Sequence, residues 1–477
     1  MIRKIFCAFS FIFAMFAVSA YAQFPSDALR LAQPTIGVGT RAIGMGSAFV
    51  PVADDYSALY WNPAGLGQLR LYEVDLGLSN FSYGNSADFF GNNSSTTVNN
   101  MRLDDIGAVF PATVGKMGLT FAVGYNKILD FTTATDFNGF NPNSSLINYE
   151  TQNYGNQSLP YLVGLAGTVN GKVVTPVTGN LQQTGNVQEG GLLHEFSIGA
   201  GGDIADNLFV GVTLNILTGS YSYNRTYTEA DVNNVYNASD TMNWTNVDLY
   251  QYGQADNISS DITGVNAIFG LLYKLENAAS FGVTITTPTS FSVTENYSST
   301  GQASFDDGSR TNLIQDPNNT GSDQYDVSTP FVFSAGAAVY PIPYLTISGA
   351  IDYVDYTQLQ FSNATQNVLD YNSQMRDIFQ SVVNYRLGAE YKIAPLGIGI
   401  RAGYEVFPSA YKGDPASYGQ KNITGGVSFL LAKKAMLDLA YVRGSFDTFQ
   451  QNYDNTSVTT STITNNSVYL SFAYRFF

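Results

Sequence analysis

The chain has 477 residues, of which 13% are charged, about half the usual share, and 14% are aromatic. Its formal net charge of −16 excludes a nucleic-acid partner, because phosphate binding needs a basic surface. No run of about 18 apolar residues follows position 18, which excludes a transmembrane helix in the rest of the sequence.

The first segment, residues 1–22, predicts a secretory signal peptide. Arg3-Lys4 supplies its positive start, an apolar stretch follows, and Ala20-Tyr21-Ala22 has the small-x-small form of a cleavage site. The alternative, an N-terminal membrane anchor, is disfavoured because the apolar stretch is shorter than about 20 residues. Cys7 is the only cysteine, so we expect a mature chain, starting at Gln23, with neither disulfides nor thiolate metal sites.

The next segment, residues 23–70, shows no strand alternation. Four glycines between Gly37 and Gly46 indicate tight backbone bends. Asp54 or Asp55 is placed to N-cap a short helix over residues 56–61, which the following Asn-Pro pair would end. The glycine spacing matches no phosphate-binding loop.

From residue 71 onward, apolar residues alternate with polar or small ones at a period of two. Between Leu396 and Val406 the even positions are apolar, whereas the odd positions hold Gly, Arg or Glu. This pattern is typical of membrane strands, with one face toward lipid and the other toward a polar interior. About fourteen segments show it, each near the length that a tilted strand needs to cross a bilayer. The segments are 71–84, 104–111, 116–127, 191–203, 207–223, 258–274, 278–296, 330–340, 344–360, 381–393, 397–408, 421–432, 435–448 and 465–477.

The connections between these segments alternate in length. The short ones are 111–115, 204–206, 276–277, 341–343, 394–395 and 433–434, and the long polar ones are 85–103, 128–190, 224–257, 297–329, 361–380, 409–420 and 449–464. Short periplasmic turns and long extracellular loops are the signature of outer-membrane barrels. The sequence therefore predicts an all-β protein, an antiparallel transmembrane β-barrel over residues 71–477, in the outer membrane of a Gram-negative bacterium.

The C-terminal segment carries an apolar and aromatic face from Val468 to Phe476, and the chain stops at Phe477. This ending resembles the C-terminal insertion signal of outer-membrane barrels. The resemblance implies that the barrel assembly machinery recognises Phe476 and Phe477. Outer-membrane lipid and lipopolysaccharide are the other partners expected of such a barrel.

The segment before the barrel resembles the N-terminal hatch of the FadL/TodX family, outer-membrane transporters of long-chain fatty acids and aromatic hydrocarbons. The resemblance rests on the run from Gly44-Met-Gly to Asn62-Pro63-Ala64-Gly65. It implies a fourteen-stranded barrel plugged by residues 23–70, in agreement with the strand count. The residues to which it assigns a hatch or gating role are Asn62, Pro63, Ala64, Gly44, Gly46, Asp54 and Asp55.

The family resemblance also implies passive uptake of a hydrophobic small molecule such as a long-chain fatty acid. The substrate would enter an apolar pocket in the lumen, and movement of the hatch would let it leave sideways through the wall. Burial of each CH2 group is favourable by about 0.8 kcal/mol, so an apolar pocket captures long chains from dilute solution.

Strand parity places Arg386 and Arg401 in the lumen, on adjacent strands that also carry Glu390 and Glu405. Both arginines are candidates for binding a carboxylate head group. An ion pair across the strands that fills the interior is the favoured interpretation.

Catalytic and metal chemistry find little support in the sequence. His194 is the only histidine, and a lone histidine does not make a nucleophile-and-base pair, so no enzyme is expected. Asp306-Asp307 and Asp54-Asp55 lack the spacing of a metal site, so neither a metal nor a cofactor is expected.

Two alternatives to uptake remain open. A shuttle for secreted proteins in type IX secretion has a hatch region that looks similar, and a general open porin is disfavoured by the hatch. A continuous apolar pocket against the hatch would favour uptake, whereas a filled barrel with a large flat loop face would favour the shuttle.

Overall fold

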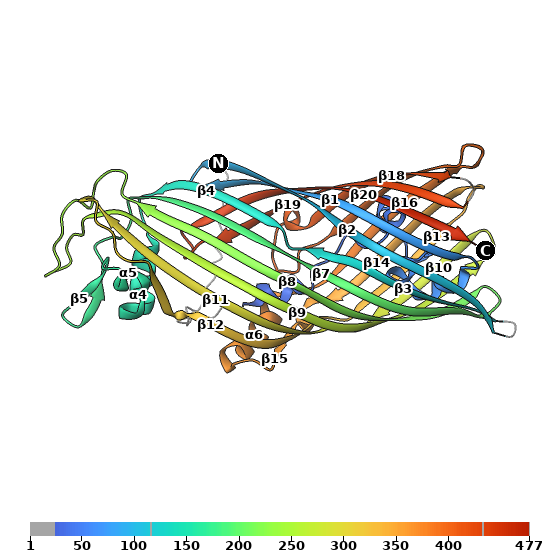
Figure 1. Ribbon diagram of the computed structural model, residues 1–477, viewed down its shortest axis with the longest axis horizontal. Helices are drawn as coiled ribbons and strands as arrows, with labels where there is room; N and C mark the ends of the chain where they lie inside the picture. Colours follow the sequence, from blue (N-terminus) through green and yellow to red (C-terminus); the bar gives the residue numbers. More distant parts are fainter. Residues whose placement is uncertain (1–23, 115–116, 432–433, 477) are drawn as a thin grey trace, which may run out of the picture.

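The computed structural model describes residues 24–114, 117–431 and 434–476, and shows an elongated barrel (Figure 1). The predicted signal peptide and Phe477 lie outside the described residues. The barrel closes because β1 (Tyr72–Phe89) pairs with both β2 (Asn92–Val114) and β20 (Val458–Phe476). All pairings are antiparallel, as expected.

The sheet holds eighteen strands, and four pairs of them are the halves of one interrupted strand, which leaves fourteen strands around the barrel. The other uninterrupted strands are β7 (Leu181–Ala205), β8 (Leu208–Ala230), β9 (Leu249–Leu275), β16 (Ser381–Ile393), β17 (Ile398–Phe407), β18 (Gln420–Leu431) and β19 (Ala435–Gln451). The interrupted ones are β3 (Met117–Asp130) with β4 (Thr133–Asn141), β10 (Ala279–Thr286) with β11 (Ser290–Phe305), β12 (Ile314–Ser328) with β13 (Val332–Val339), and β14 (Leu345–Asp355) with β15 (Gln360–Ser362).

The outer face of the barrel is apolar in its membrane part. Leu214, Leu387 and Ile400 are 58%, 61% and 52% exposed, whereas Arg386 and Arg401, at the alternate parity, are 6% and 3% exposed. Among the described residues no helix is long and apolar enough to cross a membrane. A closed barrel with an apolar outer belt satisfies every backbone group within lipid, so the chain is an outer-membrane β-barrel.

The strands extend well beyond the predicted membrane segments. Residues 85–103 were expected to form a loop, but β1 and β2 stay paired up to Phe89 and Asn92 and are joined by the tight turn Phe90-Gly91. The prediction was wrong because these strand ends lie outside the apolar belt, where both faces take polar residues and the alternation that marks a membrane strand disappears.

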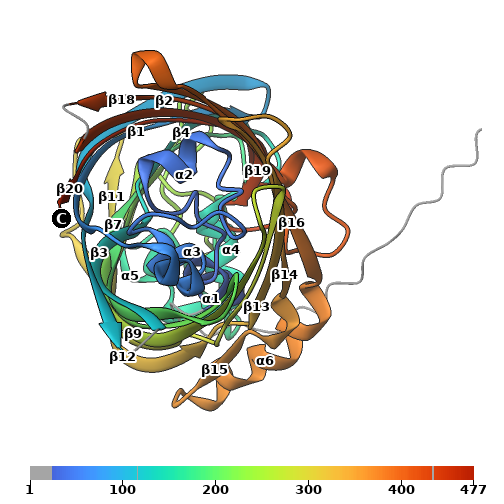
Figure 2. The ribbon, with the colours of Figure 1, turned by 90° about the vertical axis from the view of Figure 1, so that its right-hand side faces the viewer.

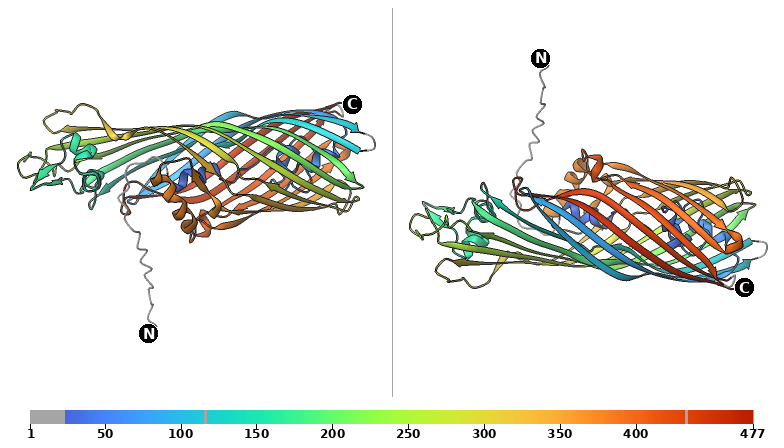
Figure 3. Two further views of the ribbon diagram at one scale, coloured as in Figure 1. Left: turned by 90° about the horizontal axis from the view of Figure 1, so that it is seen from below. Right: turned by 90° about the horizontal axis from the view of Figure 1, so that it is seen from above.

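The long connections at one end of the barrel are partly folded. The largest one holds α4 (Leu146–Tyr154), η2 (Gly155–Gln157), α5 (Leu159–Leu162) and the hairpin of β5 (Gly167–Val169) and β6 (Lys172–Val174). It packs with the extended strand ends around a second apolar core that contains Phe137, Tyr227 and Tyr252. Figures 1 and 3 show this cap at the end of the molecule opposite the C-terminus. The remaining short helices are η3 (Tyr356–Gln358), α6 (Gln366–Ile378), η4 (Ala394–Leu396) and η5 (Ala416–Tyr418).

The segment before β1 lies inside the barrel (Figure 2). It forms α1 (Pro25–Leu31), α2 (Thr40–Gly44), α3 (Ala58–Trp61) and η1 (Pro63–Gln68). The predicted helix over residues 56–61 begins two residues later than expected. The carboxylate of Asp55 accepts the backbone N–H of Ser57 at 3.0 Å, and this turn delays the first helical residue.

We expect a charge on the outer belt to destabilise the barrel. Leu387→Arg should cost about 2–4 kcal/mol of unfolding free energy, whereas Thr97→Arg, on the extended part of β2, should cost less than about 1 kcal/mol. The measurement is the urea dependence of folding into lipid vesicles. Equal costs for the two variants would contradict the position of the belt.

Candidate functional site

The predicted hatch, residues 23–70, presses the backbone of its later part against glycines of the barrel wall. A Cβ added at Gly211, Gly270 or Gly282 would overlap Pro63, Asn62 or both Val50 and Asn62. These wall positions on β8, β9 and β10 therefore require glycine because the hatch comes so close.

Asn62 ties this part of the hatch together and to the wall. Its side-chain amide donates to the carbonyls of Val50 at 3.0 Å and of Leu271, on β9, at 3.1 Å. Its side-chain oxygen accepts the N–H of Ala64 at 3.1 Å, which caps η1. The side chain is fully buried, so losing these bonds would leave buried polar groups without partners.

Gly44 and Gly46 make the matching contact on the opposite wall. Gly46 has φ +60° and lies against Gly403 of β17, and its N–H donates to the hydroxyl of Thr424 at 3.0 Å. That hydroxyl donates to the carbonyl of Gly44 at 3.2 Å. A larger residue at Gly46 would be blocked by this backbone contact, whereas a Cβ at Gly44 would come no closer than 3.3 Å to the wall.

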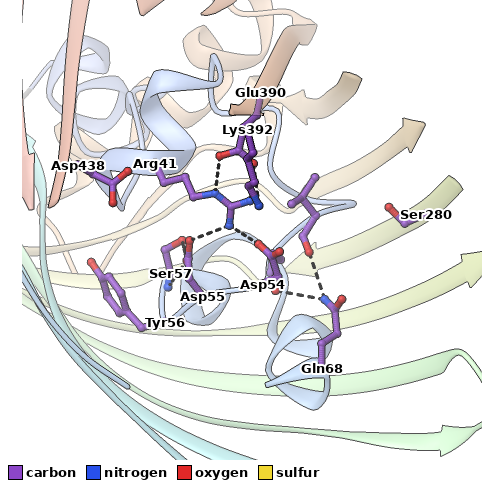
Figure 4. Close-up of polar contacts among 12 residues, drawn as sticks. Arg41, Asp54, Asp55, Tyr56, Ser57, Gln68, Ser280, Glu390, Lys392 and Asp438 are labelled. Carbon is purple, nitrogen blue, oxygen red and sulfur yellow. Dashed lines mark hydrogen bonds and ion pairs between the residues drawn. The ribbon is translucent and has the colours of Figure 1, made fainter. Parts of the chain in front are cut away.

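Arg41 is the centre of an ionic network between the hatch and the wall (Figure 4). Its guanidinium forms two bonds with Glu390 of β16, at 3.0 and 2.8 Å, and an ion pair with Asp54, and it lies 3.7 Å from Asp55. Glu390 is also paired with Arg401 at 2.8 Å. The Arg41 side chain therefore joins two carboxylates of the hatch, those of Asp54 and Asp55, to the carboxylate of Glu390 in the barrel wall.

The pKa values of the two hatch acids, Asp54 and Asp55, are shifted in opposite directions. Burial tends to raise the pKa of Asp54, but Arg41 lowers it below its usual value. Burial raises the pKa of Asp55 to about 6, against the opposing effect of Arg41 and with a further rise from Glu73. Burial would lower the pKa of Arg41, and its carboxylate neighbours raise it instead.

The two candidate arginines of the lumen are both in ion pairs. Arg401 pairs with Glu390 and with Asp438 of β19, and Arg386 pairs with Asp352 of β14. The predicted ion pair across strands is present for Arg401 and Glu390, whose Cα atoms are register partners. Arg386 is paired with the strand on its other side.

Two cavities adjoin the hatch. One, of about 280 Å³, lies around the ionic network and is lined by Arg41, Asp54 and Lys392. The other, of about 200 Å³, lies between Trp61 of the hatch, the end of α1 at Leu31, and the wall. Arg386 lines this second cavity, which we call the lumen cavity, and its guanidinium carbon lies 5.5 Å from the ring centre of Trp61.

The lumen cavity has an apolar half and a polar half. The apolar residues, which belong to the buried cluster around α1, include Leu193, Leu217, Phe291 and Val354. Two positions along the same strands the lining is polar, as at Glu195, Asn215 and Asp352. The arrangement can hold a molecule that is mostly apolar and carries a polar group.

His194 is half-buried on β7, and its Nδ1 lies 2.8 Å from the hydroxyl of Tyr125. Within the described ranges no three His, Cys, Asp or Glu residues are grouped to hold a metal.

Sequence reasoning missed Arg41 and the wall glycines. Arg41 and Glu390 are 349 positions apart, and no local pattern links them. A signal did exist for the glycines, since they sit at inward positions of otherwise regular strands, where a close backbone approach is the usual reason for glycine.

The comparisons with known proteins concern the fold. No family model matches the chain, and no curated protein is similar to it in sequence. The toluene transporter TodX of Pseudomonas putida matches the chain with 13% identity and a TM-score of 0.55. The match covers 93% of this chain and 99% of TodX. The chain has the FadL/TodX fold.

Two further structures agree. A FadL homologue of Pseudomonas aeruginosa covers 93% of the chain and 99% of its own length at 11% identity and a TM-score of 0.57. The toluene transporter TbuX of Ralstonia pickettii covers 92% and 99% at 15% identity and a TM-score of 0.51.

We expect Arg41→Met to release the hatch while the barrel stays folded. Loss of the shared cation should cost about 1–3 kcal/mol, because it removes the ionic partner of Asp54 and Asp55, whereas Glu390 keeps its pair with Arg401. The measurement is the denaturant midpoint of hatch release, followed by the fluorescence of Trp61 in a Trp244→Phe background. Arg70→Met is the control, because Arg70 is half-exposed and pairs with Asp203 at 3.1 Å. An unchanged midpoint in the Arg41 variant would contradict the role of the network.

Seating of the hatch should weaken as the pH rises through about 6. Asp55 has a raised pKa in the seated hatch, so the seated form favours its protonated state, and this contribution is complete below its ordinary pKa and lost above about 6. Asp55→Asn should remove the pH dependence and raise the hatch-release midpoint at pH 8. Asp54→Asn should lower the midpoint at pH 8, because the lowered pKa of Asp54 reflects a stabilising pair. A wild-type midpoint that rises between pH 5 and 8 would show the sign to be wrong.

Proposed function

We propose that this protein carries hydrophobic small molecules into the cell across the outer membrane, through a barrel gated by its hatch. The observation that carries the proposal is the lumen cavity, which lies directly against the hatch and has an apolar half. A binding pocket in that position is what distinguishes uptake from a protein shuttle. The names of the structural neighbours, toluene transporters and a monoaromatic hydrocarbon channel, support the same class of cargo.

The hatch is the proposed gate, with Asn62, Pro63 and Ala64 at its contact with β8 and β9, and Gly44 and Gly46 at its contact with β17. Asp54 and Asp55 belong to the network of Arg41. A molecule in the lumen cavity contacts Trp61, the neighbour of Asn62 in the chain. A bound molecule would therefore press on Trp61, the residue next to Asn62, whose side chain bonds the hatch to the wall.

A lateral exit is part of the proposal, and a seam in the wall supports it. The pairing of β2 with β3 ends at Asp105 and Asn126, and beyond it β4 pairs with β7 alone. Side chains bridge the seam instead, as between Asn100 and Thr132 at 2.9 Å. The seam starts at the margin of the apolar belt, where Met101 is 67% exposed, and Leu129 beside it lines the lumen cavity.

Long-chain fatty acids, which the family resemblance also implies as substrates, need a larger cavity than a single ring does. A cavity of about 150 Å³ holds benzene. The lumen cavity, at about 200 Å³, accepts a long alkyl chain only when α1 moves out of the apolar cluster.

A disulfide between hatch and wall tests the gate. A Cβ at Gly44 would lie 3.6 Å from the Cβ of Ala440 on β19, which suits a disulfide, and Cys7 is the chain's only cysteine. Oxidised Gly44→Cys with Ala440→Cys should lower toluene uptake into proteoliposomes at least tenfold, and reduction should restore it. Uptake that persists in the oxidised form would refute gating by this part of the hatch.

A second cross-link separates the two exits. Asn100→Cys with Thr132→Cys closes the seam and leaves the hatch free. Uptake that falls on oxidation supports the lateral exit, whereas unchanged uptake assigns the exit to the periplasmic end. The single Gly44→Cys variant under the same oxidant is the control for both experiments.

A further inference from the structure

The charged groups of the lumen cavity do not suit an anion. Its only charged lining residues within the described chain are Arg386, Asp352 and Glu195. The charge of Arg386 is already matched by its ion pair with Asp352. A carboxylate would therefore meet two acidic side chains and one arginine that is already paired, in a site where desolvation makes an unmatched charge costly.

A plain hydrocarbon does not suit the polar half either. That half is built from amide and hydroxyl side chains, among them Asn215, Asn266, Asn384, Thr284 and Ser334. Asn384 is 3% exposed, and its Oδ1 accepts no hydrogen bond from the described residues. A ligand without a donor would leave this buried oxygen unsatisfied, which weakens its binding.

Arg386 offers the complementary group two positions along the same strand. Its Nη1 is engaged by Asp352, but its buried Nε–H has no acceptor among the described residues. Asn384 and Arg386 both line the cavity and lie on the inward face of β16. A hydroxyl group donates one hydrogen bond and accepts others, so it supplies both the donor that Asn384 Oδ1 lacks and the acceptor that Arg386 Nε–H lacks.

The remaining walls suit a small ring. The rings of Tyr60 and Trp61 meet edge-to-face with centres 4.9 Å apart, and both line the cavity. The hydroxyl of Tyr60 is engaged by Thr35 at 2.6 Å, which leaves its ring for apolar contact. Aromatic faces and a volume of about 200 Å³ fit a single six-membered ring with a short substituent.

We propose that the cargo of the lumen cavity is a compact, uncharged ring compound that carries a hydroxyl group, of the phenol type. The ring lies against Tyr60, Trp61 and the apolar half, and the hydroxyl group lies between Asn384 and Arg386. This inference rests on the proposed uptake function and narrows its cargo. It sets aside the carboxylate role considered for Arg386.

Three ring compounds of similar shape test the cargo. Cyclohexanol, methylcyclohexane and cyclohexanecarboxylate do not absorb where Trp61 is excited, and Trp244→Phe leaves Trp61 as the single tryptophan of the mature chain. Titrated into the purified full-length barrel, cyclohexanol should bind at least tenfold more tightly than the other two. Tighter or equal binding of methylcyclohexane or the carboxylate overturns this inference and leaves hydrophobic uptake standing, whereas binding of none of the three overturns both.

A substitution locates the hydroxyl group. Asn384→Leu should weaken cyclohexanol binding about tenfold and leave methylcyclohexane binding unchanged or tighter. Asn452→Leu is the matched control, because Asn452 is also a buried asparagine with an unbonded Oδ1, yet it does not line the cavity. Asn384→Asp gives the complementary result, since a carboxylate in that place still accepts the hydroxyl and should retain cyclohexanol binding. It also keeps the contact testable should Asn384→Leu fail to fold. Equal effects of the Asn384 variants on all three compounds would overturn the proposed contact.

Discussion

A peptide group in lipid finds no hydrogen-bond partner except another peptide group, and this constraint organises the whole molecule. It forces β1 to pair with β20, so that the sheet has no free edge within the apolar belt. It is relaxed only where the strands leave the belt. There the pairing of β2 with β3 ends, three consecutive strands are interrupted, and side chains take over some of the hydrogen bonds. The wall is therefore rigid at the level of the hatch and less continuous at the level of the lumen cavity.

A barrel of fourteen strands is too wide for its own side chains to fill, so the interior needs a second body. The hatch fills it by two different means. Its backbone meets wall glycines on β8, β9 and β10, where contact depends on the absence of side chains. On the other side Arg41 reaches Glu390, where contact depends on charge. Packing against glycine is insensitive to pH, whereas the ionic contact includes Asp55, whose raised pKa makes it sensitive near pH 6.

The wall was predictable from sequence to a degree that the interior was not. A period of two assigns each residue a face, so Arg386 and Arg401 were correctly placed inside, and the short turns mark the strand ends. The same reasoning failed for residues 85–103, because a strand surrounded by water carries no alternation. It also could not find the partner of Arg41, since Glu390 lies in a distant strand and the contact depends on how a non-repetitive segment folds. The alternation tells whether a strand side chain points into the barrel or out of it. It does not tell which hatch residue, if any, contacts that side chain.

Arg386 was considered both as an ion-pair partner and as a ligand-binding residue. The two roles are compatible because they use different nitrogen atoms of its guanidinium group. The ion pair with Asp352 uses Nη1 and neutralises the charge, which is the structural role expected from the strand pattern. The buried Nε–H remains without an acceptor among the described residues, and Arg386 lines the cavity, so the residue keeps an unused donor after its charge has been matched. A paired arginine attracts an anion weakly, yet it still orients a neutral hydroxyl group. A cavity built in this way selects cargo by hydrogen bonding and size rather than by charge, and it does so beside Trp61, one residue from the Asn62 bonds that any outward movement of this part of the hatch must break.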